Sequence, residues 1–342
     1  MIEIDGSYGE GGGAILRQAL ALSTFTGKPF KINNIRSGRP KPGLKAQHMH
    51  SIMALEKLTG STVTDCEVGS EEIIFMPGNM KNKSIDIDIG TAGSITLLLQ
   101  ALILPCIFSN KTITISLTGG TDVKWAQPVD YLANIFAPML KEIAKIDISI
   151  LKRGYYPKGG GKITIKIKGN NSERKNQFNL TERGKLIQIK GISHCSLDLE
   201  QSRVADRQAD NAAILLSKQN VPVNIMRQYN HTSSTGSGIT LWAMFSRENQ
   251  DVPIIIGADS LGEKGKTSEE IGAEAAKNMN SELESEGVID KYLADQLIPI
   301  MGVIKGVIKT SEITNHTKSN IYVTEKFLET RFKIKETTII AH

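Results

Sequence analysis

The sequence predicts a mixed α/β (α+β) fold, and two observations carry this prediction. Short strand-like segments alternate with amphipathic helical segments along the 342 residues. In addition, Gly-rich turns that lead into helices recur about 80 residues apart, which indicates a repeated supersecondary unit. A chain of this length usually forms two or three domains, and 40% hydrophobic residues are enough to build a core.

The proposed repeat begins with a Gly-rich turn and continues through two helices. The turn at residues 10–13 leads into a predicted helix over 14–25, and the turn at 90–94 leads into one over 95–104. After each comes a strand (30–35 or 112–117), a Gly-containing turn and a second helix (43–58 or 128–143). The alternative is that glycines precede helices in many α/β proteins without any repetition.

A different pattern starts near residue 184. It comprises a strand, a helix, three strands and a helix, at 186–189, 201–219, 223–229, 238–245, 252–256 and 267–283. We therefore expect an inserted small domain over residues 184–284, and a large repeat domain over residues 1–183 and 285–342. The polar stretch 169–177 is predicted to be a loop before the boundary. After the insertion, a helix is expected at 289–301 and strands at 321–328 and 330–340.

Charge and cysteine content restrict the class of protein only weakly. The net charge of +5 permits a polyanionic partner without requiring one. Three widely spaced cysteines give neither a zinc set nor a disulfide framework, which favours a reducing compartment. The longest apolar run, residues 95–108, is too short and too interrupted to span a bilayer, and the first residues do not resemble a signal peptide. We expect a soluble, cytoplasmic protein without membrane contact.

Two short segments resemble nucleotide-binding motifs, and a third such motif is absent. The segment DGSYGEGGG (5–13) before a helix suits an anion, but it lacks the GxGxxG spacing and could be only a tight turn. The segment SLGEKGKT (260–267) has Ser260 where a phosphate-binding loop needs glycine. The Lys-x-Asp-Gly motif of lysine adenylylation is absent, since Glu3 stands where lysine would be.

Basic and histidine residues give further candidates. The segment RSGRPKPGLKAQH (36–48) places Arg36 and Arg39 in a Pro/Gly-stiffened loop, where guanidinium groups could bind phosphate oxygens; an ordinary surface loop is the alternative. His48 and His50 would point to different faces of a helix, so they do not form a zinc set. His316 alone would be a weak candidate, because an isolated histidine is usually structural or exposed.

Taken together, these segments resemble the RNA 3′-terminal phosphate cyclase family. The resemblance rests on EGGGAILR (10–17), RSGRPKPGLKAQH (36–48), TAGS (91–94) with Gln100, RGYYPKGGG (153–161), YLADQ (292–296) and the late His316. It covers essentially the whole chain in one register. It implies three repeated βαβαββ-type units, similar to the C-terminal domain of a bacterial translation initiation factor, with an inserted smaller domain of thioredoxin-like topology.

The resemblance also implies a reaction. The family converts an RNA 3′-phosphate to a 2′,3′-cyclic phosphate with ATP, through a histidyl-AMP intermediate and an RNA(3′)pp(5′)A anhydride. Activation is needed because the 2′-OH cannot displace oxide from a phosphate monoester. The family therefore implies ATP as co-substrate, a divalent metal (Mg²⁺ or Mn²⁺) and RNA 3′-phosphate ends as partners. A homo-oligomer is also possible.

Site residues are carried over position by position from this resemblance. His316 matches the nucleophile, and Glu10 matches a carboxylate near the triphosphate that could contact the metal. Arg17, Arg36, Arg39 and Gln47 match residues that hold ATP or RNA phosphates. The nucleotide pocket is implied at Gln100, Pro128, Tyr292, Leu293, Ala294, Asp295 and Gln296.

Two other classes of function remain as alternatives. One is a cyclase-like ribosome-biogenesis protein that binds RNA or partners without this chemistry, although such relatives lack the histidine matched by His316. The other is an enolpyruvyl-transferase-like enzyme, whose fold also repeats β/α units. With only 5% aromatic residues and no RRM-like strand, RNA recognition is expected to be local to the 3′ end.

Overall fold

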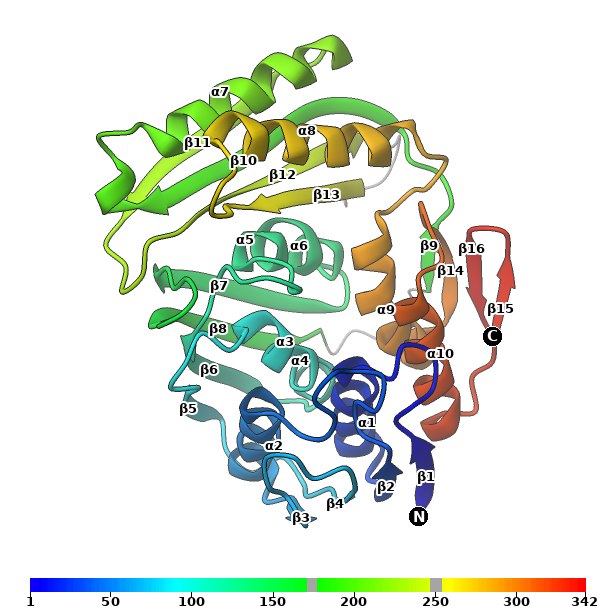
Figure 1. Ribbon diagram of the computed structural model, residues 1–342. Helices are drawn as coiled ribbons and strands as arrows, with labels where there is room; N and C mark the ends of the chain where they lie inside the picture. Colours follow the sequence, from blue (N-terminus) through cyan, green and yellow to red (C-terminus); the bar gives the residue numbers. More distant parts are fainter. Residues whose placement is uncertain (171–176, 247–253) are drawn as a thin grey trace.

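The chain folds into four four-stranded sheets covered by helices (Figure 1). The structure, a computed structural model, describes residues 1–170, 177–246 and 254–342. Three of the sheets have the same strand order, in which the first strand is followed by the second, fourth and third of its unit. The predicted mixed α/β class with three repeated βαβαββ units is therefore confirmed.

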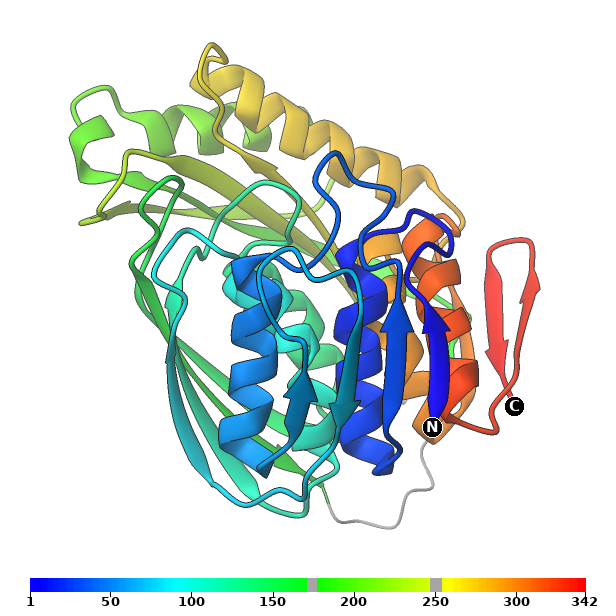
Figure 2. The same ribbon diagram turned by 60° about the horizontal axis from the view of Figure 1, so that its bottom comes forward.

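The first unit uses residues from the N-terminus to position 76. Its strands and helices are β1 (Ile2–Asp5), α1 (Gly13–Thr26), β2 (Phe30–Asn33), α2 (Ala46–Thr59), β3 (Thr62–Thr64) and β4 (Ile73–Met76). Strand β1 pairs in parallel with β2, and β4 runs antiparallel to β2 and β3. Figure 2 shows this sheet in front of helices α1 and α2. Both helices were predicted, and their ends differ by a few residues from the expected bounds.

The second unit repeats this topology with less regular helices. It consists of β5 (Ser84–Asp88), α3 (Ile95–Gln100), α4 (Ile103–Ile107), β6 (Thr112–Gly119), α5 (Val129–Tyr131), a π-helical turn (Leu132–Phe136), α6 (Ala137–Met139), β7 (Ala144–Lys152) and β8 (Gly161–Gly169). The single helix expected at 95–104 is divided into α3 and α4. The π-helical turn ends two residues before Pro138, which has no N–H to donate to a regular helix.

The third unit is formed by two separate parts of the sequence, one before residue 185 and one after residue 290. Its elements are β9 (Phe178–Leu180), α9 (Lys291–Ile304), β14 (Gly306–Lys309), α10 (Asn315–Phe327), β15 (Phe332–Lys335) and β16 (Thr338–Ala341). The strand expected at 330–340 is a hairpin of β15 and β16, because Glu336 turns the chain with a φ of 54°. The predicted loop 169–177 lies mostly outside the described residues.

The strand expected at 321–328 is wrong, because this segment belongs to helix α10. Its β-branched residues favour a strand locally. However, Asn320, Val323, Thr324 and Phe327 recur at helical spacing and form one buried face. At the N-terminus, the Thr314 hydroxyl accepts a hydrogen bond from the backbone N–H of Thr317 at 2.9 Å. Burial of this face and the cap outweigh the local preference.

The fourth sheet is built from the segment between β9 and α9. Its elements are β10 (Lys185–Ser196), α7 (Val204–Leu216), β11 (Val223–Asn230), β12 (Ser237–Ser246), β13 (Ile254–Leu261) and α8 (Ser268–Glu284), in the strand order β11-β10-β12-β13. The expected β-α-β-β-β-α succession is confirmed, although part of the strand predicted at 252–256 lies outside the described residues. Helices α7 and α8 cover one face, and α5 and α6 of the second unit lie beneath the other (Figure 1).

Close contacts join the units into one core. The ring of Phe30 in the first unit lies edge-on to Phe327 of the third, with 5.9 Å between centroids. Between the second unit and the fourth sheet, Gly257 provides space for a ring: a Cβ at this position would lie 2.5 Å from Tyr131. Among the described residues, no helix combines the length and the apolar character that crossing a membrane requires.

Truncation of Phe327 tests the contact between the first and third units. Phe327→Ala should lower the free energy of unfolding by about 3–5 kcal/mol, because it removes a fully buried ring and leaves a cavity. Urea unfolding followed by circular dichroism measures this change. Val68→Ala is the control, since Val68 is 70% exposed and its truncation should have little effect. Equal effects of the two substitutions would contradict the proposed packing.

Candidate functional site

A cleft of about 1080 Å³ lies where the three repeated units and the fourth sheet meet. Segments far apart in the sequence form its wall: the Gly-rich loop with α1, the basic loop 36–45, the starts of α2, α9 and α10, and parts of β13 and α8. It brings together most of the predicted site residues, namely Glu10, Arg17, Arg36, Arg39, Gln47, Gln100, Tyr292, Asp295, Gln296 and His316.

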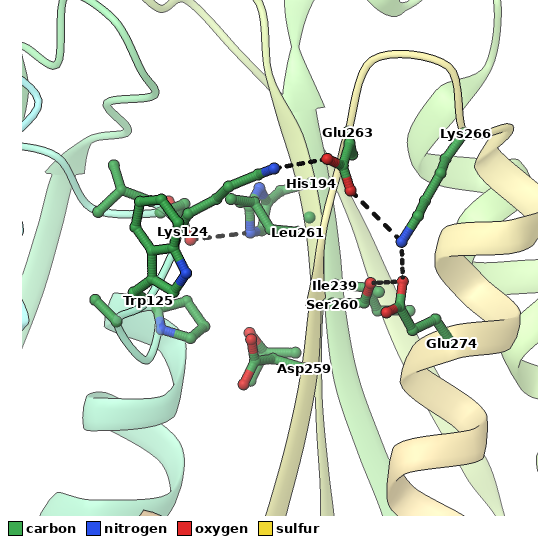
Figure 3. Close-up of a pocket in the computed structure, with 16 residues that line it drawn as sticks. Lys124, Trp125, His194, Ile239, Asp259, Ser260, Leu261, Glu263, Lys266 and Glu274 are labelled. Atoms are coloured by element: carbon green, nitrogen blue, oxygen red, sulfur yellow. Dashed lines mark hydrogen bonds and ion pairs between the residues drawn. The ribbon is translucent and has the colours of Figure 1, made fainter. Parts of the chain in front are cut away.

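Three predicted residues do not line this cleft. Leu293 and Ala294 are fully buried in α9, so their side chains pack in the core. Pro128 lines a smaller neighbouring cavity of about 250 Å³, between the β6–α5 loop and the fourth sheet (Figure 3). Trp125 and Ala126 line both spaces, so Pro128 lies close to the cleft without bordering it.

His316, Glu10 and Arg39 form a chain of polar contacts in the cleft. The Nε2 atom of His316 lies 3.5 Å from Oε2 of Glu10, and the same oxygen accepts a hydrogen bond from Nη2 of Arg39 at 3.1 Å. Burial lowers the pKa of His316 below its usual value; the Glu10 carboxylate opposes this shift, while Arg17 and Arg39 add to it. The imidazole is therefore mainly neutral at pH 7 and retains a lone pair for bonding.

Asp295 fixes the helix turn that carries His316. Its Oδ1 atom accepts hydrogen bonds from the hydroxyl groups of Thr314, at 2.7 Å, and Thr317. Its backbone carbonyl accepts one from the amide group of Asn320 at 2.7 Å. Burial raises the pKa of Asp295 to about 7. These contacts join α9 to the start of α10 and make Asp295 a support for the position of His316.

Asp290 fixes the start of α9, and the sequence analysis did not single it out. Its Oδ1 atom accepts hydrogen bonds from the backbone N–H groups of Tyr292 and Leu293, at 3.0 Å each. It also receives the hydroxyl of Tyr131 at 2.6 Å, while Oδ2 receives the backbone N–H of Gly257 at 2.9 Å. An aspartate immediately before a helical pattern is a cap signal, and this could have identified it.

The nearby side chains of α9 are positioned by this cap. The ring of Tyr292 is 38% exposed and lines the cleft, and the ammonium group of Lys291 lies 5.6 Å from its centroid. The side-chain amide of Gln296 donates to the backbone carbonyl of Tyr292 at 3.2 Å. Tyr292 therefore offers an aromatic surface inside the cleft.

The arginines fall into three different environments. Arg17 is buried and donates from Nε to Oε1 of Gln100 at 2.9 Å; burial lowers its pKa to about 10, so it remains protonated at neutral pH. Nη1 of Arg36 donates to the backbone carbonyls of Lys41 and Gly43, at 2.8 Å each, and so shapes the basic loop. Arg39 alone pairs with a carboxylate, that of Glu10, among the contacts described.

His48 lies buried beneath these cations. Its Nδ1 atom accepts a hydrogen bond from the backbone N–H of Lys45 at 3.1 Å. Burial, together with Arg17, Arg36 and Lys45, lowers the pKa of His48 to about 3. Glycine is required at position 13, because a Cβ there would lie 2.4 Å from Nε2 of His48. His48 is thus a neutral packing residue.

The two walls of the cleft differ in charge. On one wall, no ion pair with a carboxylate involves Arg17, Arg36, Lys41 or Lys45 in the described part of the chain. Mutual repulsion is visible at Lys45, whose pKa is lowered chiefly by Arg36. On the other wall, burial raises the pKa values of Asp259 and Glu282 to about 7. The basic wall suits phosphate groups, and the other wall presents polar but less charged groups.

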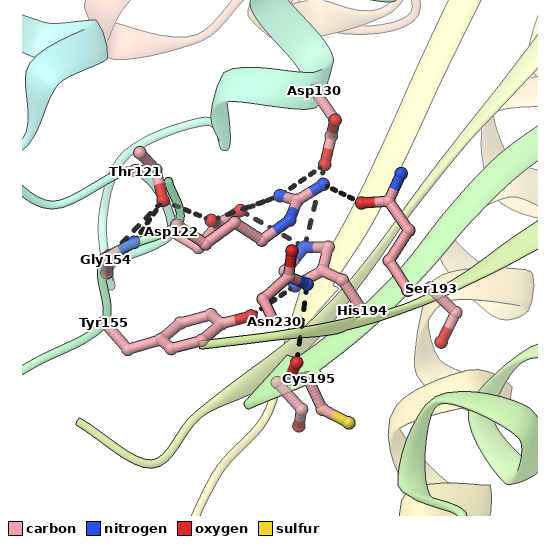
Figure 4. A network of polar contacts seen from close by, with 12 residues as sticks. Thr121, Asp122, Asp130, Gly154, Tyr155, Ser193, His194, Cys195 and Asn230 are labelled. Atoms are coloured by element: carbon pink, nitrogen blue, oxygen red, sulfur yellow. Dashed lines mark hydrogen bonds and ion pairs between the residues drawn. The ribbon is translucent and has the colours of Figure 1, made fainter. Parts of the chain in front are cut away.

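A second buried polar cluster lies outside the cleft, between the second unit and the fourth sheet (Figure 4). Asp122, Asp130 and His194 approach closely enough to suggest a metal site. However, Nη1 of Arg153 lies 2.8 Å from Oδ2 of Asp130 and 3.4 Å from Oδ2 of Asp122. The guanidinium already supplies the positive charge that a metal ion would bring, so this cluster is an ion-pair network. It explains structurally why RGYYPKGGG begins with arginine.

Comparisons with known proteins agree with the fold and the cleft. A family model described as RNA 3′-terminal phosphate cyclase matches residues 8–334. The chain is 45% identical to an RNA 3′-terminal phosphate cyclase of Pyrococcus furiosus, over 98% of this chain and 95% of the relative. It is 42% identical to one of Archaeoglobus fulgidus, over 99% of both chains, and 43% identical to one of Saccharolobus solfataricus, over 98% and 96%.

The family model covers nearly the whole chain, so the class of protein is an enzyme of RNA 3′ ends. The chain belongs to the RNA 3′-terminal phosphate cyclase family, as its sequence motifs led us to expect.

The burial of neutral His48 predicts a specific loss of stability in acid. The pKa of His48 is about 3 in the folded protein and about 6.5 in an unfolded chain. Between these values the unfolded chain binds more protons, so this residue should decrease stability by about 1.4 kcal/mol per pH unit as the pH falls.

Urea unfolding at several pH values between 4 and 8 would measure this contribution. His48→Asn can place an amide oxygen where Nδ1 accepts from the Lys45 N–H but does not titrate, so its stability should fall less steeply below pH 6.5 than that of the unmodified protein. The exposed His231→Asn is the control and should leave the slope unchanged. Identical slopes for all three proteins would show that His48 is not the titrating group.

Proposed function

We propose that this chain catalyses the ATP-dependent conversion of an RNA 3′-phosphate to a 2′,3′-cyclic phosphate. The observation that carries the proposal is a half-buried, neutral His316 at the edge of a basic cleft, in contact with Glu10. A neutral imidazole can act as a nucleophile, and the cations of the basic wall can hold phosphate groups. Family membership supplies the expected substrates, ATP and an RNA 3′-phosphate end.

The proposed reaction has three steps. A ring nitrogen of His316 attacks the α-phosphorus of ATP, so that an N–P bond forms and pyrophosphate leaves. An oxygen of the RNA 3′-phosphate then attacks the same phosphorus and breaks the N–P bond, which gives an RNA(3′)pp(5′)A anhydride and frees the histidine. Finally, the neighbouring 2′-OH attacks the RNA phosphorus, loses its proton, and AMP leaves. This last step is intramolecular and gains from proximity.

The proposed roles of the phosphate-binding residues follow from their environments. Arg17 and Arg39 lie close enough to His316 to lower its pKa, in addition to the larger effect of burial. Arg36 combines hydrogen bonds to the loop with a place in the cleft wall, and Gln47 lies in the first turn of α2 on the same wall. We assign these four residues to the phosphates of ATP or RNA.

The proposed nucleotide pocket lies between α3, the β6–α5 loop and the start of α9. Gln100 and Tyr292 border the cleft, and Gln296 hydrogen-bonds to the backbone of Tyr292. Pro128 closes the neighbouring cavity. Leu293, Ala294 and Asp295 contribute by holding α9 and α10 in place, because the first two are fully buried and Asp295 is bonded to Thr314 and Thr317.

A divalent ion, Mg²⁺ or Mn²⁺, forms part of the proposal. Proteins that transfer phosphoryl or nucleotidyl groups usually hold Mg²⁺ with one or two carboxylates together with substrate phosphates. Glu10 fits this requirement, since its carboxylate is partly exposed in the cleft beside Arg39 and His316. When bound, the ion would neutralise charge on the ATP phosphates.

The proposed organisation keeps two domains, with the large one at residues 1–183 and 285–342 and the inserted one at 184–284. The fourth sheet and its two helices fall within the second range. A cytoplasmic location and a homo-oligomer are further parts of the proposal.

Covalent labelling tests the nucleophile. With α-³²P-ATP, a divalent metal and no RNA, the protein should acquire an acid-labile, alkali-stable label that survives a denaturing gel. His316→Ala should abolish this label and reduce cyclisation at least 1000-fold, because no other group in the proposal forms the N–P bond. His231→Ala, at an exposed histidine, is the matched control. Full cyclisation by His316→Ala would exclude the mechanism.

Substrate variants test the last two steps. An RNA with a 3′-OH should remain unchanged, because it has no phosphate to accept AMP. An RNA with a 3′-phosphate but a 2′-deoxy terminal sugar should accumulate the RNA(3′)pp(5′)A anhydride, because the cyclising hydroxyl is missing. Gel electrophoresis of end-labelled oligonucleotides distinguishes these products. A strong preference for internal base sequence would contradict recognition confined to the 3′ end.

A further inference from the structure

One large aromatic side chain borders the cleft but has no role in the reaction proposed above. Trp125 lies in the loop between β6 and α5 and is 93% exposed. The second tryptophan of the chain, Trp242, is only 7% exposed and packs in the core. The backbone at Trp125 has a φ of 63°, a region that bulky residues rarely adopt. An exposed indole in this conformation contributes little to folding.

The loop that carries Trp125 is fixed at several points. Before it, Asp122 is held by Arg153 and by His194, whose Nε2 atom lies 3.2 Å from Asp122 Oδ1. After it, the Thr96 hydroxyl donates to the backbone carbonyl of Gln127 at 2.8 Å. The adjacent Lys124 forms an ion pair of 2.6 Å with Glu263 of the fourth sheet's β13–α8 loop. The indole is therefore presented by a constrained loop.

Trp125 borders both the cleft and the smaller cavity beside it. Figure 3 shows the indole across the smaller cavity from Asp259 and Leu261 of β13. Because Trp125 borders both spaces, an RNA chain that extended from the cleft into the smaller cavity would reach its indole. In proteins that bind single-stranded nucleic acids, aromatic side chains beside basic grooves stack with successive bases.

We propose that Trp125 stacks against a base of the 3′-terminal dinucleotide of the RNA substrate. This inference rests on the proposed function, because it requires RNA in the cleft. The adenine of ATP is the competing occupant. Tyr292 provides an aromatic surface inside the cleft and is 38% exposed, whereas Trp125 is 93% exposed and also borders the smaller cavity, so its indole suits a longer ligand than ATP. Stacking against any base also agrees with recognition that does not depend on sequence, since every base has a π-face.

Kinetics of two variants test the stacking. Trp125→Leu removes the aromatic ring but keeps an apolar side chain, and it should raise KM for RNA about 5- to 150-fold. Trp125→Phe should retain most of the affinity. Neither substitution should change AMP labelling of His316 by ATP without RNA. An abasic nucleotide at one of the last two positions of the RNA should make Trp125→Leu and the unmodified enzyme equivalent.

Fluorescence gives an independent measurement, because Trp125 and Trp242 are the only tryptophans. A 3′-phosphorylated oligonucleotide should quench the emission, ATP alone should not, and Trp125→Phe should abolish the quenching. Quenching by ATP alone, combined with weaker labelling in Trp125→Leu, would overturn the proposal and assign Trp125 to the nucleotide. An unchanged KM would also overturn it. If ATP does not label the unmodified protein, the proposed function is refuted. Quenching by RNA that depends on Trp125 is measured without ATP, so it tests the stacking separately.

Discussion

The carboxylate of Asp290 receives four hydrogen bonds from three parts of the chain, and the cleft depends on this junction. Two come from the first turn of α9, one from Tyr131 of the second unit and one from the backbone of β13. Burial raises the pKa of this carboxyl, while the four donors oppose that shift. A buried carboxyl with so many donors is costly to break, because each donor would lose its partner. The second unit, the fourth sheet and α9 are thereby held in one arrangement.

From this fixed helix, a second aspartate positions the residue proposed as nucleophile. Asp295 lies further along α9 and binds the Thr314 and Thr317 hydroxyls at the start of α10. His316 lies between these two threonines, so its backbone has little freedom. The contact with Glu10 then comes from the first unit, through a loop that packs against Arg39. Three repeats and one insertion thus contribute to a single site.

Electrostatics in the cleft reflect a balance between holding phosphates and keeping imidazoles neutral. Burial is the main cause of the lowered pKa values of both His48 and His316, and the cations that suit phosphate groups add to it because they repel a protonated histidine. Glu10 partly offsets this at His316 but does not contact His48. As a result, one histidine is neutral in the core, and the other is neutral where ligands can reach it. The same basic wall can therefore support substrate binding and nucleophilic attack.

The sequence by itself determined the mixed α/β class, the repeat, the β-α-β-β-β-α succession and the family. These follow from local patterns, since periodic hydrophobicity and Gly-rich turns act over a few residues. It also indicated the candidate residues, because the order of the motifs along the chain can be recognised from the sequence alone. Tertiary structure decided that residues 321–327 form a helix, because only packing against α9 and α1 buries that face. It also decided that Asp290 links three segments and that Arg153 neutralises a buried acidic pair. Contacts between residues more than 100 positions apart, such as Tyr131 with Asp290, leave no local pattern, so only the folded chain reveals them.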